Sequence, residues 1–211
     1  MATQETRERI LSAAEQCFGD LGFSATTMRD ITAAAGVNLA SVNYHFGSKE
    51  ALFHAVVDRA LRVVREQRAL RLEALHERDV EPSLEELIDV IIGPVLAISD
   101  PATERGRSVA RLLARGLTEP ASDLQEAAVD VMRGETETIA ELRLRLPGVG
   151  PDELLCRLRS MVGAVLVHQL DLPLPGLDSI HPVGTDEPST EQRQRWVARF
   201  IAGGLTADPA G

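Results

Sequence analysis

Apolar side chains recur at helical spacing along most of the chain. The clearest stripe lies near the N-terminus, advances in steps of three and four residues, and consists of Ile10, Ala13, Ala14, Cys17, Phe18 and Leu21. Residues that favour strands do not gather into alternating runs. The pattern therefore predicts an all-α protein with about nine helices.

Residues that cap or break helices divide the N-terminal part of the chain. We expect the first helix to end at Gly22, and Thr27 with Asp30 to form the capping box of a short second helix. Gly36 suits the left-handed residue at the end of that helix. A third helix is expected over 38–46, and two short helices joined by a glycine-containing turn are typical of a helix-turn-helix motif.

A fourth helix, expected over 49–77, connects this motif to the rest of the chain. It carries arginines at three-residue steps: Arg59, Arg62, Arg65 and Arg68. This spacing favours a solvated face, with contacts to DNA or ion pairs to a second domain as alternatives. The break at 77–83 predicts a helix-turn-helix domain at 1–53 and a second domain at 78–211.

Residues that cap or break helices also divide the second domain. The predicted features are a capping box at Ser83 and Glu86, a kink at Gly93–Pro94, a helix start at Asp100–Pro101, a helix from near Ser122 to about Leu146, a break at 147–151, an apolar helix over 152–170, an irregular loop over 173–188 and a last helix capped by Ser189 and Gln192.

Charge limits how the chain could bind DNA. The formal net charge is −10. Within 1–53, six carboxylates outnumber the four cations, which are Arg7, Arg9, Arg29 and Lys49. DNA binding must therefore rest on a few placed contacts and not on a basic field. The two cysteines lack motif spacing, so neither a disulfide framework nor a metal site is expected, and no cofactor motif is present. Without a signal segment or a long apolar run, we expect a soluble cytoplasmic protein.

The third helix offers a narrow outer face once its apolar residues are buried. Val37, Val42 and Phe46 are expected to anchor the helix, which leaves small and polar groups free to enter a major groove. Asn38 and Asn43 suit base edges, and Leu39 and Ala40 suit thymine methyl groups. The full set of predicted DNA contacts is Thr27, Arg29, Asn38, Leu39, Ala40, Ser41, Asn43, Tyr44, His45 and Lys49.

The segment TRERILSAAEQCFGDLGFSATTMRDITAAAGVNLASVNYHFGSKEALFHAVV resembles the DNA-binding region of TetR-family regulators over 6–57. The glycines, the YHF triplet and the SKEAL helix start fall in the family's order. Thr32 replaces the more usual alanine, and Asn43 stands where tyrosine is common. The resemblance implies a homodimer on a palindromic operator, with a ligand pocket in the second domain and a dimer bundle made by the last two helices.

The second domain also resembles the PsrA-type subgroup, through PSLEEL, ARLLARG, PGVGPDELLCRL and FIAGGL. This likeness implies a repressor released by a small hydrophobic effector of fatty-acid or acyl type. Core packing is the competing interpretation for the apolar pocket candidates, and surface ion pairs for the arginines. The pocket candidates are Ile91, Val95, Arg111, Leu112, Arg115, Met132, Val162 and Leu166. The dimer candidates are Leu155, Leu158, Val162, Val165, Trp196 and Phe200.

Two other functions compete with a DNA-binding regulator. A small α-helical enzyme would need a catalytic set, yet no Ser-His-Asp set, paired-carboxylate motif, metal-spaced cluster or phosphate-binding glycine loop is apparent. A helical scaffold or partner-binding protein is the second alternative, and the acidic charge balance of 1–53 keeps it open.

Overall fold

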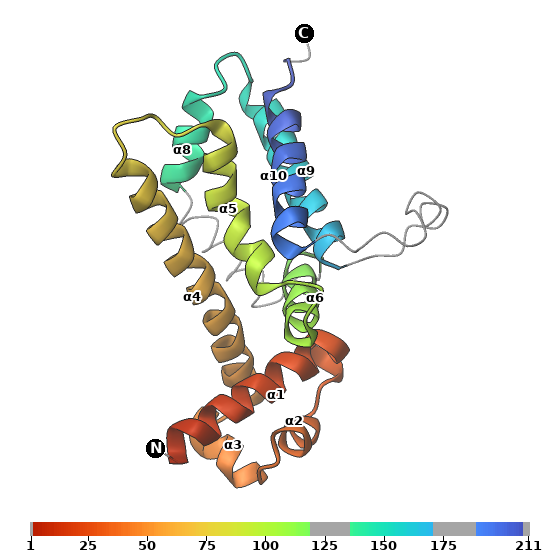
Figure 1. The fold of residues 1–211 in the computed structure, drawn as a ribbon. Coiled ribbons are helices and arrows are strands. Elements are labelled where there is room, and N and C mark those ends of the chain that lie inside the picture. Colours follow the sequence, from red (N-terminus) through yellow and green to blue (C-terminus); the bar gives the residue numbers. More distant parts are fainter. Residues whose placement is uncertain (1, 119–135, 171–188, 209–211) are drawn as a thin grey trace.

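The computed structural model describes residues 2–118, 136–170 and 189–208, and these ranges fold into helices without strands (Figure 1). The prediction of an all-α protein is confirmed. In these ranges the helices are α1 (Ala2–Ala25), α2 (Met28–Ala35), α3 (Leu39–Phe46), α4 (Lys49–His76), α5 (Leu84–Ile98), α6 (Glu104–Thr118), α8 (Thr136–Leu144), α9 (Pro151–Gln169) and α10 (Thr190–Thr206). None of them is long and apolar enough to cross a membrane.

The helices form two groups joined by α4. Figure 1 shows α1, α2 and α3 together at one end of the molecule, while α5, α8, α9 and α10 form a bundle at the other end. The long α4 runs between the two ends, and α6 lies between α1 and the bundle. The short helices α2 and α3 are therefore presented at a tip, supported from behind by α1 and α4.

Each group has its own apolar core. The first core combines Ile10, Ala13, Ala14 and Phe18 of the predicted α1 stripe with Ile31 of α2, Val42 of α3 and Leu52 of α4, all buried. Cys17 packs against this core partly buried, whereas Leu21, the last residue of the predicted stripe, is 50% exposed and lies outside it. Leu112 of α6 completes it, so this core draws on a residue far outside the predicted 1–53 region. The second core lies among α5, α8, α9 and α10. The first core explains how α2 and α3, eight residues each and unstable alone, keep one orientation.

Most predicted caps are present. Thr27 and Asp30 form the reciprocal capping box of α2, Ser83 and Glu86 form that of α5, and the Ser48 hydroxyl accepts from the Ala51 amide at the start of α4. Gly36 is left-handed, with φ of 61°. These local signals work from sequence because both partners lie three residues apart.

One predicted helix end is confirmed and two predicted helix starts were wrong. The first helix is interrupted at Gly22 as expected, because this residue leaves helical geometry with φ of 82° and ψ of 166°, and a short helical stretch follows to Ala25. Asn38 is the N-cap of α3 and not its first residue. The helix expected at Asp100–Pro101 begins at Glu104, because the Thr103 hydroxyl, not Asp100, accepts from the Gly106 amide of the first turn at 2.9 Å. The expected helix start at Ser122 and the loop over 173–188 lie outside the described residues.

The arginine row of α4 is not a uniformly solvated face. Arg68 is buried and donates through Nε and Nη2 to the carbonyl oxygen of Ile91 on α5, at 2.9 and 2.5 Å. Arg59 pairs with Glu15 of α1 at 2.7 Å. Arg65 pairs with Asp58 on the surface, and Arg62 is exposed. Of the expected alternatives, an ion pair to the second domain describes neither residue: Arg59 is paired with α1, and Arg68 reaches the second domain through a hydrogen bond to a backbone carbonyl.

Replacing Thr27 by alanine is expected to lower the free energy of unfolding by about 1 kcal/mol, because the amide of Asp30 loses its acceptor and the first turn of α2 loses its cap. Urea unfolding at equilibrium measures this loss. Thr32→Ala is the matched control, since it removes a hydroxyl from the same helix that donates only to the preceding turn. Equal stabilities for both variants would show that the cap contributes nothing.

Candidate DNA-binding face and ligand cavity

The turn between α2 and α3 is held from behind by α1. Nη2 of Arg9 donates to the carbonyl oxygen of Ala35 at 2.6 Å and to that of Gly36 at 3.1 Å. These carbonyls end α2, where a cation is favoured by the helix dipole. Arg9 thus holds the turn in place, although the residue itself is exposed.

The outer face of α3 is exposed and narrow. Val42 is fully buried on the inner side, whereas Leu39, Ala40, Asn43 and Tyr44 are exposed, Tyr44 to 80%. The small side chain of Ala40 keeps the middle of this face slim. A rigid helix with a slim outer face fits the width of a major groove.

Two of the predicted DNA-contact residues form the N-terminal cap of α3. Oδ1 of Asn38 accepts from the Ser41 amide at 2.8 Å and from the Ser41 hydroxyl at 2.9 Å. The oxygen of Asn38 is therefore committed to the cap, and only its amino group is left for another partner. The Ser41 hydroxyl donates its proton to this same oxygen of Asn38.

Ring contacts orient the residues at the end of α3 and the start of α4. His45 is half-buried, and its ring centre lies 5.2 Å from that of Tyr44 and 6.1 Å from that of Phe46. Nζ of Lys49 lies 4.4 Å from the centre of the Phe23 ring. This cation–π contact holds Lys49 close to the surface, beside the N-terminus of α4.

The charge available for DNA is smaller than the sequence count suggests. Arg7 lies over the Phe46 ring at 5.2 Å and Arg9 caps α2, which leaves the exposed Arg29 and the half-buried Lys49 on this tip. At the start of α2, hydrogen bonds from the Thr27 hydroxyl and amide hold the pKa of the Asp30 carboxyl below its usual value. Of the predicted contacts, Thr27 is thus occupied by Asp30, while Arg29 is exposed beside it.

An apolar cavity of about 140 Å³ lies between α4, α5, α6 and α9. Four predicted pocket residues line it: Ile91, Val95, Val162 and Leu166. Its other lining residues are Leu61, Val64, Arg68, Ile92, Ser99, Ala110, Leu113, Met161, Val165 and Gln169.

The remaining pocket candidates lie elsewhere. Arg111 pairs with Asp20 of α1, and Leu112 is buried in the first core. The guanidinium of Arg115 lies against Gly22. Met132 lies outside the described residues. Sequence spacing selected the correct faces of α5 and α9 but could not tell which face of α6 turns toward α1.

The polar wall residues of the cavity were missed in the sequence. Pro94 has no amide proton, so the carbonyl of Val90, four residues earlier, loses its helical donor. Arg68 donates to the carbonyl of Ile91 instead, so the proline gave no signal for this bond. Gln169, at the end of α9, gave no signal either.

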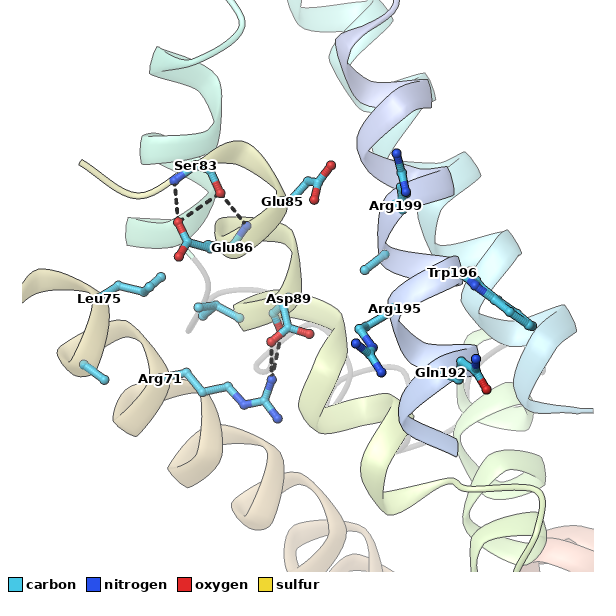
Figure 2. A pocket seen from close by; sticks show the side chains of 13 residues that line it. Arg71, Leu75, Ser83, Glu85, Glu86, Asp89, Gln192, Arg195, Trp196 and Arg199 are labelled. Atoms are coloured by element: carbon cyan, nitrogen blue, oxygen red, sulfur yellow. Dashed lines mark hydrogen bonds and ion pairs between the residues drawn. The ribbon is translucent and has the colours of Figure 1, made fainter. Parts of the chain in front are cut away.

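A larger groove of about 960 Å³ is open on the surface (Figure 2). Figure 2 shows Arg71 and Asp89 on one side, paired at 2.5 Å, and Arg195, Trp196 and Arg199 of α10 on the other. Six charged side chains line this groove. One of them, Glu86, has its pKa lowered to about 2 by hydrogen bonds from Arg78 and Ser83, so it stays ionised. The smaller cavity is the better site for an apolar molecule.

Both α9 and α10 expose apolar side chains. Leu155, Trp196 and Phe200 are exposed, Phe200 to 74%. Of the other dimer candidates, Leu158 and Val162 are half-buried, while Val165 belongs to the second core. Sequence reasoning missed Val167, which is also exposed, and Gly203 and Gly204, where an added Cβ would meet open space.

Within the described residues, no group of three or more histidine, cysteine or acidic side chains could hold a metal ion. The two cysteines are both free thiols.

Comparisons with known proteins agree for both halves of the chain. Residues 10–56 match the model for bacterial regulatory proteins of the tetR family, and residues 89–204 match the model for the tetracyclin repressor-like C-terminal domain. The second match alone covers more than half of the chain.

Individual relatives are similar over different lengths. The HTH-type transcriptional regulator UidR of Escherichia coli strain K12 is 28% identical over 121 residues, which cover 56% of this chain and 55% of UidR. The chain thus spans about half the length of the curated relatives it matches. The HTH-type transcriptional dual regulator CecR of Shigella flexneri is 44% identical over 52 residues, covering 25% of this chain and 23% of CecR.

Among solved structures, NalD is similar over nearly its whole length. It is described as the secondary repressor of the MexAB-OprM multidrug efflux pump in Pseudomonas aeruginosa. It is 25% identical, with a TM-score of 0.64, covering 98% of this chain and 99% of that one. The relatives are transcriptional regulators and not enzymes, which removes the enzyme alternative.

Proposed function

Because the chain belongs to the TetR family of bacterial regulatory proteins, we propose that it is a repressor that binds a palindromic operator as a homodimer and is released by a small hydrophobic effector. The observation that carries this proposal is the slim outer face of α3. It is clamped by the buried Val42 and presents Asn43 and Tyr44 at the tip of the molecule.

Dimerisation is supported by the exposed face of α9 and α10. Leu155, Trp196 and Phe200 are costly to leave in water, and a second copy of the same face would cover them. The open space beside Gly163, Gly203 and Gly204 would let two backbones approach closely. A two-fold dimer with its α3 helices about 34 Å apart would meet successive turns of the major groove, so the operator should be palindromic.

Repression and release have separate supports. NalD, which is similar along its whole length, is described as a repressor. The apolar cavity among α4, α5, α6 and α9 is the place for an effector that favours an arrangement unable to bind DNA. The predicted PsrA-type likeness and the acyl-type effector stay predictions. Such a regulator would act in the cytoplasm, where bacterial DNA lies.

Selection of bound fragments from a random duplex pool tests the proposal and separates it from the scaffold alternative. We expect the full-length protein to enrich a palindrome. The Asn43→Ala, Tyr44→Ala double variant should bind that sequence roughly 100-fold more weakly, because each subunit loses two groove contacts.

Val80→Ala is the matched control, since Val80 is exposed in the α4–α5 connection, away from the tip. Circular dichroism should show that all three proteins are folded. If the folded parent protein enriches no palindrome, or the double variant keeps the parent's affinity, the regulator proposal is wrong and the scaffold alternative gains support.

A further inference from the structure

The cavity between α4, α5, α6 and α9 is small. Binding pockets for drug-sized ligands commonly measure roughly 300–1,000 Å³, whereas this cavity has about 140 Å³. A buried apolar cavity of about 150 Å³ in another protein holds a benzene molecule. The volume therefore suits a compact molecule of about one aromatic ring and not a long acyl chain.

Among the residues that the structure describes, the wall of the cavity combines eleven apolar residues with three polar ones, and none of these fourteen is acidic. Two of the polar residues are already bonded within the protein. Ser99 donates its hydroxyl proton to the carbonyl oxygen of Val95 at 2.5 Å, and Arg68 donates to that of Ile91. These two residues need no ligand to satisfy those donors.

Gln169 differs from the other two polar wall residues. It is 4% exposed, and its Oε1 is buried without a hydrogen-bond partner among the described residues. A buried acceptor without a donor destabilises the folded protein, because it has lost its hydrogen bonds to water and gained none within the protein. The last torsion of a glutamine is soft, so its oxygen can turn toward the cavity. A ligand that supplies a donor at this point would remove the cost.

The charge of the wall selects the kind of donor. An ammonium group would be buried in a wall that includes the Arg68 guanidinium and none of the acidic residues that could pair with it. A carboxylate brings no proton for Oε1. A neutral hydroxyl group brings one proton, is small and leaves the rest of the volume to apolar atoms.

We propose that this cavity binds a neutral, mostly apolar molecule of about one aromatic ring, whose hydroxyl group donates to the Gln169 side-chain oxygen. The proposal rests on the cavity being the effector site of the proposed repressor. It narrows the effector from any small hydrophobic molecule to a compact hydroxyl-bearing one of phenol type.

Calorimetric titration of the full-length protein with p-cresol and p-xylene tests this proposal, because the two probes have nearly the same shape and differ by a hydroxyl in place of a methyl group. We expect both probes to bind the parent protein. The preference for p-cresol over p-xylene should fall by about tenfold in Gln169→Leu, which has no acceptor. Gln169→Met gives the same test if the leucine variant does not fold.

Two further variants test whether the probes bind in this cavity. Gln192→Leu removes an exposed amide of α10 outside the cavity, and its preference should equal that of the parent. Ala110→Leu adds volume to the cavity wall on α6, and it should weaken both probes alike. The proposal is overturned if neither probe binds the parent, if Gln169→Leu and Gln169→Met keep the parent's preference, or if Ala110→Leu binds both probes as well as the parent.

Because these measurements need no DNA, their outcome is independent of the test for operator binding. A protein that enriches a palindrome but ignores both probes would keep the repressor proposal and lose the hydroxyl-bearing ligand. A protein that shows the probe preference but enriches no DNA would keep the hydroxyl-bearing ligand and lose the repressor proposal.

Discussion

A Gly19→Val variant is expected to lose about 3 kcal/mol of its free energy of unfolding. Gly19 lies on α1 where this helix crosses α6. A Cβ added there would overlap the carbonyl oxygen of Ser108 and lie 3.0 Å from its carbonyl carbon. These are backbone atoms inside a helix, so they cannot rotate away as the end of a side chain would. The two helices would have to separate, and the packing of Leu112 in the first core would be lost with them.

Gly19→Ala separates the clash from helix propensity. Alanine favours a helix interior over glycine by about 1 kcal/mol, so a net loss of stability in this variant shows a clash that exceeds this gain. Urea unfolding of both variants measures the effect, with Gln4→Ala at an exposed position of the same helix as control. An unchanged unfolding midpoint for Gly19→Val would contradict the close crossing of α1 and α6.

The same crossing connects the two proposed sites. On α6, Ser108 and Arg111 face α1, while Ala110 and Leu113 line the cavity. Since α1 also carries Arg9, which holds the turn before α3, a change at the cavity has a packed route to the DNA-binding face. Operator affinity of Gly19→Ala is therefore expected to fall even where the protein stays folded.

Local signals explain what the sequence could predict. Capping residues and their partners lie three positions apart, and the apolar stripe of α1 repeats within one helix, so both were readable without the fold. The slim face of α3 was readable for the same reason. The error at Asp100 has a local cause as well, because Thr103 offered a second capping group only three residues later.

Long-range pairings explain what the sequence could not predict. Arg9 bonds to residues 26 and 27 positions away, and Arg68 bonds to a backbone carbonyl 23 positions away, so neither use follows from spacing. Counting charges over 1–53 treated Arg7 and Arg9 alike, although Arg7 lies over the Phe46 ring and Arg9 bonds to the end of α2. The cavity was similarly hidden, because its wall residues have the same apolar pattern as the core around them.

Glu15→Ala is expected to lower the free energy of unfolding by about 3 kcal/mol. Glu15 is 1% exposed, and its Oε2 accepts from Nη2 of Arg59 on α4 at 2.7 Å, while Oε1 accepts from Nε of Arg105 on α6 at 2.8 Å. The carboxylate thus joins three helices. Without it, the largely buried Arg59 keeps a charge that has lost its nearest counter-ion.

The two arginines should contribute unequally. The side chain of Arg105 is 64% exposed, so water screens its attraction to Glu15, and Arg105→Ala should cost no more than about 1 kcal/mol. Its hydrogen bond to Glu15 raises the pKa of the guanidinium, which therefore stays charged at any working pH. Arg59, by contrast, is only 13% exposed, and its partner Glu15 cannot be replaced by water at that depth.

A double-mutant cycle decides whether the cost of Glu15→Ala comes from the orphaned Arg59. Replacing Glu15 and Arg59 together by leucine and methionine removes both charges and fills much of the same volume. We expect this pair to be more stable than Glu15→Ala, because no unpaired charge remains near the core. Equilibrium urea unfolding of the parent, Glu15→Leu, Arg59→Met and the pair gives the coupling free energy. A pair whose loss equals the sum of the single losses would show that Glu15 acts by packing alone, and the three-helix ion pair would then have no energetic role.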